Sequence, residues 1–92
     1  MKKLDFSVIE RAGLTQQEFA DAAAVSRVTT NKWVMGKMAP HRYIKKRITE
    51  LLDVLEAAIE DDQLPLPSGM PKHQRPAAIR AAISTAQAAL NS

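Results

Sequence analysis

The sequence predicts an all-α fold, in which four or five short helices are followed by a C-terminal helix. Helix-favouring residues dominate the 92 residues, and aromatic residues make up only 4% of them. No alternation of apolar and polar residues with period two marks a strand. Apolar residues instead recur at helical spacing through the middle of the chain. We therefore expect a small helical domain without a sheet.

The first helix is expected to run from Asp5 or Ser7 to Ala12. Ser7 and Glu10 have the spacing of a capping box, in which the two side chains cap each other's backbone N–H groups. Gly13 follows as a residue that can adopt the left-handed conformation at a helix end.

Two short helices separated by a tight turn are expected next. The first is predicted to start at Thr15 and end at Ala22 or Ala23, because Thr15-Gln16-Gln17-Glu18 forms a second capping box. The second is predicted over residues 27–35, with Ser26 as its N-cap and Gly36 as its stop.

A longer fourth helix is expected after Pro40, which suits a first helical turn. Its apolar residues recur every three or four positions and form one stripe: Ile44, Ile48, Leu51, Leu55 and Ile59. We expect this stripe to face the core, with one side free for a dimer contact. The sequence leaves open whether the helix is continuous or broken near Thr49.

The rest of the chain is predicted to be a linker and one more helix. Prolines and a glycine interrupt residues 65–71, and Pro76 opens an alanine-rich helix that ends near Leu90. The larger apolar side chains of this helix, Ile79, Ile83 and Leu90, share a stripe with Ala82 and Ala86. The predicted organisation is a domain over residues 1–62, a proline-rich linker over 63–76 and an amphipathic helix over 77–92 for dimerisation or packing. Lys72-His73-Gln74-Arg75 is expected to be solvated linker rather than an arm that touches DNA.

Charge is unevenly distributed along the chain, whose net charge is +3. No acid occurs between residues 22 and 49, where the bases are Arg27, Lys32, Lys37, Arg42, Lys45, Lys46 and Arg47. In residues 50–62 the sign of the charge reverses, and every charged residue is an acid: Glu50, Asp53, Glu56, Glu60, Asp61 and Asp62. A basic block within an ordered region indicates a polyanionic partner, although a solvated face is the simpler alternative.

Several classes of function lack support in the sequence. There is no cysteine for a disulfide, a thiol nucleophile or a thiolate metal site. His41 and His73 are isolated, and the acids of residues 50–62 are expected to form a solvated helix face, so no metal site is predicted. No phosphate-binding glycine loop is present, and we expect neither an enzyme nor a cofactor. No apolar stretch could cross a membrane and no signal peptide is recognisable, so a cytoplasmic, nucleoid-associated protein is expected.

The helix over residues 27–35 is predicted to have a core face and a free face. Thr30 and Trp33 lie three residues apart and can pack back against the preceding helix. The opposite face covers an arc of roughly 140° and carries Arg27, Val28, Asn31 and Lys32. Arginine and lysine can donate to guanine, asparagine can bind adenine, and valine can contact a thymine methyl group. This face therefore has the chemistry of a major-groove reader.

The segment from Thr15 to Ser26, together with Trp33 and Gly36-Lys37-Met38-Ala39-Pro40, resembles the Cro/repressor-type (lambda-repressor-like, XRE) helix-turn-helix family. The resemblance covers residues 5–60 and implies a bundle of four or five helices whose third helix enters the major groove. It departs from the family pattern at two positions. Ala24 occupies a turn position usually held by glycine, and Thr30 stands where valine or isoleucine is usual.

The resemblance also implies a role for individual residues. Base-reading positions match Arg27, Val28, Asn31 and Lys32. Positions that contact the DNA backbone match Gln16, Ser26, Thr29, Lys37, His41 and Arg42. Together these imply a repressor-like regulator of phage or plasmid type, acting as a homodimer on a near-palindromic double-stranded operator. The alternative is an antitoxin-type interaction module whose C-terminal helix, over residues 77–92, binds a partner protein.

Overall fold

The computed structural model describes residues 4–91, which form five α-helices and one 3₁₀ turn and contain no strand. The helices are α1 (Ser7–Arg11), α2 (Gln16–Ala23), α3 (Arg27–Val34), α4 (Arg42–Glu60) and α5 (Arg75–Leu90), and the turn η1 (Lys72–Gln74) leads directly into α5. The all-α class and the C-terminal helix are confirmed. Residues 1–3 and 92, at the outer ends of the predicted segments 1–62 and 77–92, lie outside the described residues.

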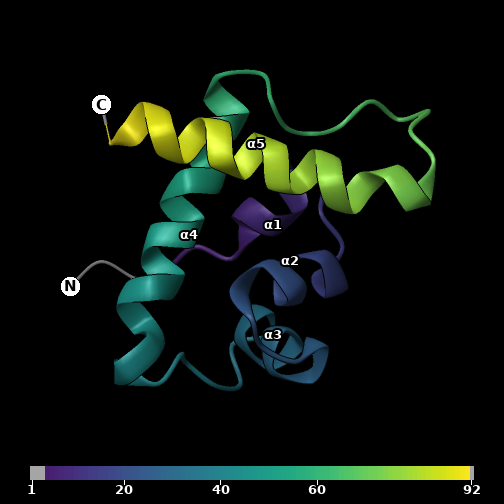
Figure 1. Cartoon of the computed structure of the whole chain (residues 1–92). Helices are drawn as coiled ribbons and strands as arrows, with labels where there is room; N and C mark the ends of the chain where they lie inside the picture. The colour runs from purple at the N-terminus through teal and green to yellow at the C-terminus, as the bar shows by residue number, and fades with distance from the viewer. Residues whose placement is uncertain (1–3, 92) are drawn as a thin grey trace.

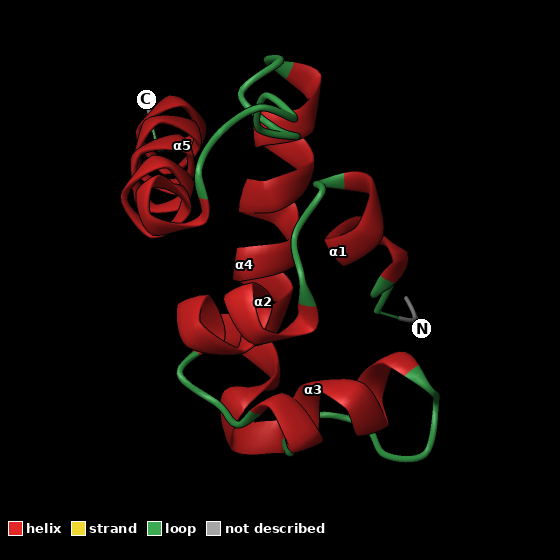
Figure 2. Ribbon diagram, turned by 90° about the vertical axis from the view of Figure 1, so that its right-hand side faces the viewer, coloured by secondary structure: helices red, strands yellow, loops and turns green. Residues whose placement is uncertain are grey.

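The long helix α4 organises the molecule (Figure 1). Its 19 residues are continuous through Thr49, so the open question of a break is resolved. The C-terminal helix α5 crosses the second half of α4, while α2 and α3 lie near the other end (Figure 1). Figure 2 shows α3 below α2 at the end of the molecule opposite α5.

The core is formed where α4 meets the other helices. The predicted stripe is confirmed in part: Ile48 and Leu55 are fully buried, whereas its central residue, Leu51, is only half-buried. Phe19 from α2 is also fully buried, as are small residues that allow helices to approach closely: Ala12, Ala20, Ala58 and Ala86. Burying each large apolar side chain contributes roughly 1.5–3 kcal/mol. Leu90 departs from the predicted stripe of α5, since 53% of it is exposed.

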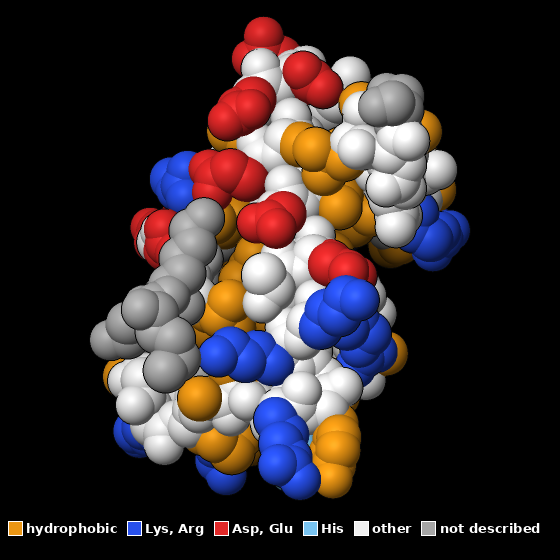
Figure 3. All heavy atoms as spheres, turned by 90° about the vertical axis from the view of Figure 1, so that its left-hand side faces the viewer, with side chains coloured by type: hydrophobic (Ala, Val, Ile, Leu, Met, Phe, Trp, Pro, Cys, Tyr) orange, Lys and Arg blue, Asp and Glu red, His pale blue; other side chains and the backbone are white. Residues whose placement is uncertain are grey.

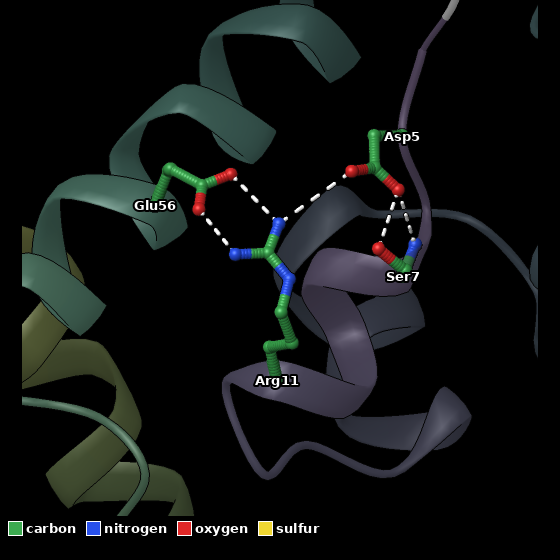
Figure 4. Close-up of polar contacts among 4 residues, drawn as sticks. All are labelled: Asp5, Ser7, Arg11 and Glu56. Atoms are coloured by element: carbon green, nitrogen blue, oxygen red, sulfur yellow. Dashed lines mark hydrogen bonds and ion pairs between the residues drawn. The ribbon is translucent and has the colours of Figure 1, made fainter.

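The start of α1 differs from the prediction. No side-chain capping box forms between Ser7 and Glu10; Phe6 is the N-cap and makes no side-chain cap bond. Instead, Asp5 Oδ1 accepts hydrogen bonds from both the backbone N–H and the hydroxyl of Ser7 (Figure 4). A carboxylate two residues earlier is the stronger acceptor and takes both donors.

An ion pair ties α1 to α4. Arg11 donates to both carboxylate oxygens of Glu56, at 2.5 and 3.0 Å, and lies 3.5 Å from Asp5 (Figure 4). The hydrogen bond from Arg11 lowers the pKa of the Glu56 carboxyl. Because the side chains of Arg11 and Glu56 are 46% and 39% exposed, solvent screens the attraction and the pair contributes little stability.

The stretch between α4 and η1 is anchored to the body of the protein. Leu64 is buried, and a side-chain Cβ placed on Gly13 would lie 2.6 Å from the Cβ of Pro65. Pro65 therefore packs directly against the turn between α1 and α2. At the other end of α4, the helix begins later than expected, because Pro40 precedes the N-cap residue His41. None of the helices in the part of the chain described is both long and apolar enough to span a membrane.

Candidate nucleic-acid interface

The start and end of α2 follow from its sequence. Thr15 Oγ1 accepts a hydrogen bond from the Glu18 N–H at 3.0 Å, and Glu18 Oε1 accepts one from the Thr15 N–H at 2.9 Å, so the predicted capping box is confirmed. The helix ends with Ala24 in the left-handed conformation, with φ 58° and ψ 42°. A left-handed alanine costs about 1 kcal/mol. The tight turn between α2 and α3 is therefore slightly strained at Ala24.

The start of α3 is fixed by Ser26. Its hydroxyl accepts a hydrogen bond from the Thr29 N–H at 3.0 Å and donates to Thr29 Oγ1 at 2.9 Å. Thr30 Oγ1 donates to the backbone carbonyl of Ser26 at 3.2 Å, which satisfies a hydroxyl that is fully buried. Ser26 and Thr29 therefore hold the first turn of α3 in shape.

The inner face of α3 is anchored by Trp33, which is only 3% exposed. Its ring stacks on Phe6, with centroids 5.7 Å apart and planes inclined by 28°, and Phe6 meets Phe19 edge to face. The indole Nε1 has no hydrogen-bond partner among the described residues, which costs about 1–3 kcal/mol. Stacking and burial thus determine the position of this ring.

The outer face of α3 carries the four predicted base-reading residues. Arg27, Val28, Asn31 and Lys32 are all exposed, and Val28 is 63% exposed although it is aliphatic. Neither Arg27 nor Lys32 is ion-paired with another described residue. The structure therefore brings these side chains together on one accessible face.

A hydrogen bond that the sequence analysis missed links α2 to this face. The Asn31 side-chain amide donates from Nδ2 to Gln16 Oε1 at 3.1 Å. The two residues are 15 positions apart, so no short motif reveals the contact. Gln16 was predicted to contact the DNA backbone and Asn31 to read a base; the structure joins their side chains.

The remaining predicted backbone contacts lie after α3. Gly36 has a left-handed φ of +73°, and the exposed residue Lys37 donates its backbone N–H to the Lys32 carbonyl at 2.9 Å. His41 caps α4, with Nδ1 accepting from the Tyr43 N–H at 3.3 Å. The exposed side chain of Arg42 lies over the Tyr43 ring.

The surface around these residues is polarised. Figure 3 shows Lys and Arg side chains gathered on the lower half of one face, and Asp and Glu side chains along its upper half, over the second half of α4. In the sequence, the bases of residues 27–47 lie on α3, in the loop after it and in the first turns of α4, whereas the acids of residues 50–62 lie later in α4 and just after it. The potential therefore favours an anionic partner at the first end and disfavours one at the second.

A hydrogen-bonded ion pair between Glu18 and Arg75, which we call the clasp, connects α5 to α2. The sequence analysis did not predict it. Arg75 donates from Nε to Glu18 Oε2 at 2.7 Å, and from Nη2 to Glu18 Oε1 and the Gly13 carbonyl, both at 2.9 Å. The hydrogen bond from Arg75 lowers the pKa of the Glu18 carboxyl. The prediction that Arg75 is a solvated linker residue was wrong, because its side chain is only 20% exposed.

A groove of about 670 Å³ lies beside this clasp, between α2, α4 and α5. Leu51, Ile79 and Ile83 give it an apolar lining, with Asp21 on the α2 side and Arg80 on the α5 side. Asp21 and Arg80 form no ion pair with other described residues. No cluster of three or more potential metal-ligating side chains is found within residues 4–91.

Comparisons with known proteins point to one group of relatives. No protein-family model matches the chain, and neither does any solved structure. The chain is 34% identical over 76 residues to the mycobacterial cidal antitoxin MbcA of Mycobacterium bovis and of two strains of Mycobacterium tuberculosis. The match covers 75% of this chain and 67% of each relative.

Proposed function

This chain belongs to the family of the mycobacterial cidal antitoxin MbcA, and we propose from that membership that it is itself an antitoxin, which binds and neutralises a toxin protein. The extent of the match carries the proposal. Three quarters of the chain is about 69 residues, more than the 62 that precede the proline-rich stretch. The similarity therefore includes part of the C-terminal region and is not confined to the two short helices α2 and α3. Such a protein acts by binding rather than by catalysis.

The groove between α2, α4 and α5 is the surface that we assign to the toxin. The apolar face of α5 is not free for this purpose, because Ile79, Ala82 and Ala86 are buried against the rest of the protein. The groove leaves Ile83 and Leu51 partly accessible between Asp21 and Arg80, neither of which is in an ion pair with another described residue. An apolar lining with charged edges suits an amphipathic helix of a partner protein.

Growth rescue tests the antitoxin proposal, which predicts that a toxin gene lies beside the gene for this chain. The neighbouring gene is expressed alone and together with this chain, both from unrelated promoters so that DNA binding plays no part. Wild-type chain should restore growth. Arg80→Glu should weaken the rescue, while Arg47→Glu, a charge reversal on the exposed side of α4 outside the groove, should not. A neighbouring gene product whose toxicity the wild-type chain leaves unchanged would count against the proposal.

Sequence-specific binding to double-stranded DNA is the second candidate function. The observation that favours it is the orientation of α3, whose Trp33 is buried while Arg27, Asn31 and Lys32 face solvent. In this role Arg27, Val28, Asn31 and Lys32 read bases. Contacts with the phosphate backbone come from Gln16, Ser26, Thr29, Lys37, His41 and Arg42. A homodimer on a near-palindromic operator would place two copies of α3 about 34 Å apart, and the expected outcome is repression.

Two alanine variants separate base reading from phosphate binding. Arg27→Ala should lose roughly 1–3 kcal/mol on a duplex selected from a random pool, and should relax one base position. Lys37→Ala should weaken binding to all duplexes alike and reduce the salt dependence by about one unit. Fluorescence anisotropy at a series of salt concentrations measures both quantities. Unchanged affinity of Arg27→Ala for selected and random duplexes would exclude base reading by α3.

A further inference from the structure

Three neighbouring side chains stack on one another in solvent at the start of α4. The His41 and Tyr43 rings lie 4.8 Å apart with planes inclined by 27°. The Arg42 guanidinium lies 5.0 Å from the centre of the Tyr43 ring, and its Nη2 donates to the Tyr43 hydroxyl at 3.2 Å. We call His41, Arg42 and Tyr43 the aromatic platform.

The aromatic platform has no role in the hydrophobic core. Tyr43 is 78% exposed and is not among the residues packed against the core. Single exposed apolar residues are ordinary in proteins, but this ring is held on its face by an imidazole and at its hydroxyl by a guanidinium. Ordering an exposed side chain costs conformational entropy, and a side chain ordered in advance loses less on binding.

The chemistry of the aromatic platform suits a phosphodiester. The Tyr43 hydroxyl accepts a hydrogen bond from Arg42, so its own proton remains available to donate. The adjacent guanidinium polarises this hydroxyl and has further N–H donors. A neutral donor and a charged donor thus lie side by side, and both kinds of donor contact phosphates in protein–DNA interfaces.

The position of the aromatic platform selects double-stranded DNA as its partner. The start of α4 lies at the same end of the molecule as α3 (Figure 1). Lys45 and Lys46 follow on α4, and the sequence holds no acid from residue 22 to residue 49. A phosphate backbone that passes α3 would meet positive charge here.

We propose that Tyr43, together with Arg42, binds a backbone phosphate of the duplex that α3 reads. Tyr43 is then an additional DNA contact beyond the residues that the sequence predicts. The inference rests on the second candidate function, DNA binding by α3. The Tyr43 hydroxyl donates to the phosphate oxygen, and His41 holds the ring in place.

The test is the substitution Tyr43→Phe, which keeps the ring and removes the hydroxyl. Affinity for a duplex selected with the wild-type chain should fall about ten- to a hundredfold, the worth of one hydrogen bond to a charged group. Because tyrosine is uncharged, the salt dependence should stay as in the wild type. Arg42→Ala should lower both the affinity and the salt dependence, the latter by about one unit.

The controls separate this proposal from the function on which it rests. Leu90→Ala removes another exposed apolar side chain, at the far end of α5, and should bind like the wild type. All variants should show the thermal melting curve of the wild type. If Tyr43→Phe binds as tightly as the wild type while Arg27→Ala does not, the Tyr43 contact is overturned and DNA binding stands. If Tyr43→Phe lowers the salt dependence of duplex binding as much as Arg42→Ala does, the direct contact of the Tyr43 hydroxyl with a phosphate is overturned as well. If the wild-type chain selects no duplex, both proposals fail.

Discussion

Two left-handed residues show how single positions shape the turns around α2. Ala24 adopts φ 58° at the end of α2, and Gly13 adopts φ +70° before its start. Glycine takes up this conformation freely, whereas a side chain crowds the following carbonyl. The backbone is therefore strained at Ala24 and unstrained at Gly13.

Ala24→Gly should stabilise the protein by about 1 kcal/mol, because it relieves the left-handed strain. The matched control is Ala81→Gly, at an exposed position inside α5, which should destabilise by about 1 kcal/mol. Urea unfolding followed by circular dichroism measures both changes. A loss of stability in Ala24→Gly would show that Ala24 is not left-handed in solution.

Gly13→Ala and Gly36→Ala should differ, although both residues have a left-handed φ. The new Cβ of Gly13→Ala would lie 2.6 Å from Pro65, whereas that of Gly36→Ala would meet nothing within 4 Å. We expect about 1 kcal/mol of destabilisation at Gly36 and roughly 2–4 kcal/mol at Gly13, where overpacking adds to the strain. Equal losses in urea unfolding would mean that Pro65 does not pack on this turn.

At the scale of elements, the clasp between Glu18 and Arg75 decides how α5 is attached. Glu18 caps α2 with one carboxylate oxygen and shares both oxygens with Arg75. The same carboxylate thus serves the first turn of α2 and the first turn of α5. Breaking the pair would leave a partly buried charge without its partner, which is costly.

The clasp gives the protein a specific pH dependence. The pKa of Glu18 is lowered in the folded state. The charged Glu18 carboxylate therefore contributes its full stabilisation of the folded protein above the ordinary glutamate pKa of about 4.3. It should be lost progressively as the pH falls through the lowered folded-state pKa. Arg75→Met should reduce stability at neutral pH by roughly 1–3 kcal/mol and flatten this acid dependence.

The matched control for the clasp is Arg11→Met. It removes the more exposed pair with Glu56 and should destabilise the protein clearly less than Arg75→Met does. Thermal melting from pH 3 to pH 7 compares the variants with the wild type. If Arg75→Met retained the wild-type pH profile, Glu18 would not be the group responsible.

Local sequence signals predict the ends of α2 and α3 well, because Thr15, Ser26 and Gly36 act on neighbours within one turn. Burial of Trp33 also follows from helical spacing. The clasp and the contact of Pro65 with Gly13 could not be predicted in this way, since each joins residues that are about 50 positions or more apart. The capping box at Ser7 failed for a local reason, because Asp5 competes for the same donors.

At the scale of the whole molecule, the two proposed surfaces are separate. The exposed face of α3 lies at the basic end, while the groove assigned to the toxin lies between α2, α4 and α5. Of the residues assigned to DNA contact, none lines the groove. A toxin and a duplex could therefore be bound by one chain at the same time.

The most direct test of the antitoxin account is calorimetric titration of the purified chain with the purified product of the neighbouring gene. The account predicts a saturable complex of the two proteins, weakened at least tenfold by Arg80→Glu and unchanged by Arg47→Glu, since about 1.4 kcal/mol corresponds to that factor. Absence of binding between the two folded proteins, or equal affinity for wild type and Arg80→Glu, would contradict it.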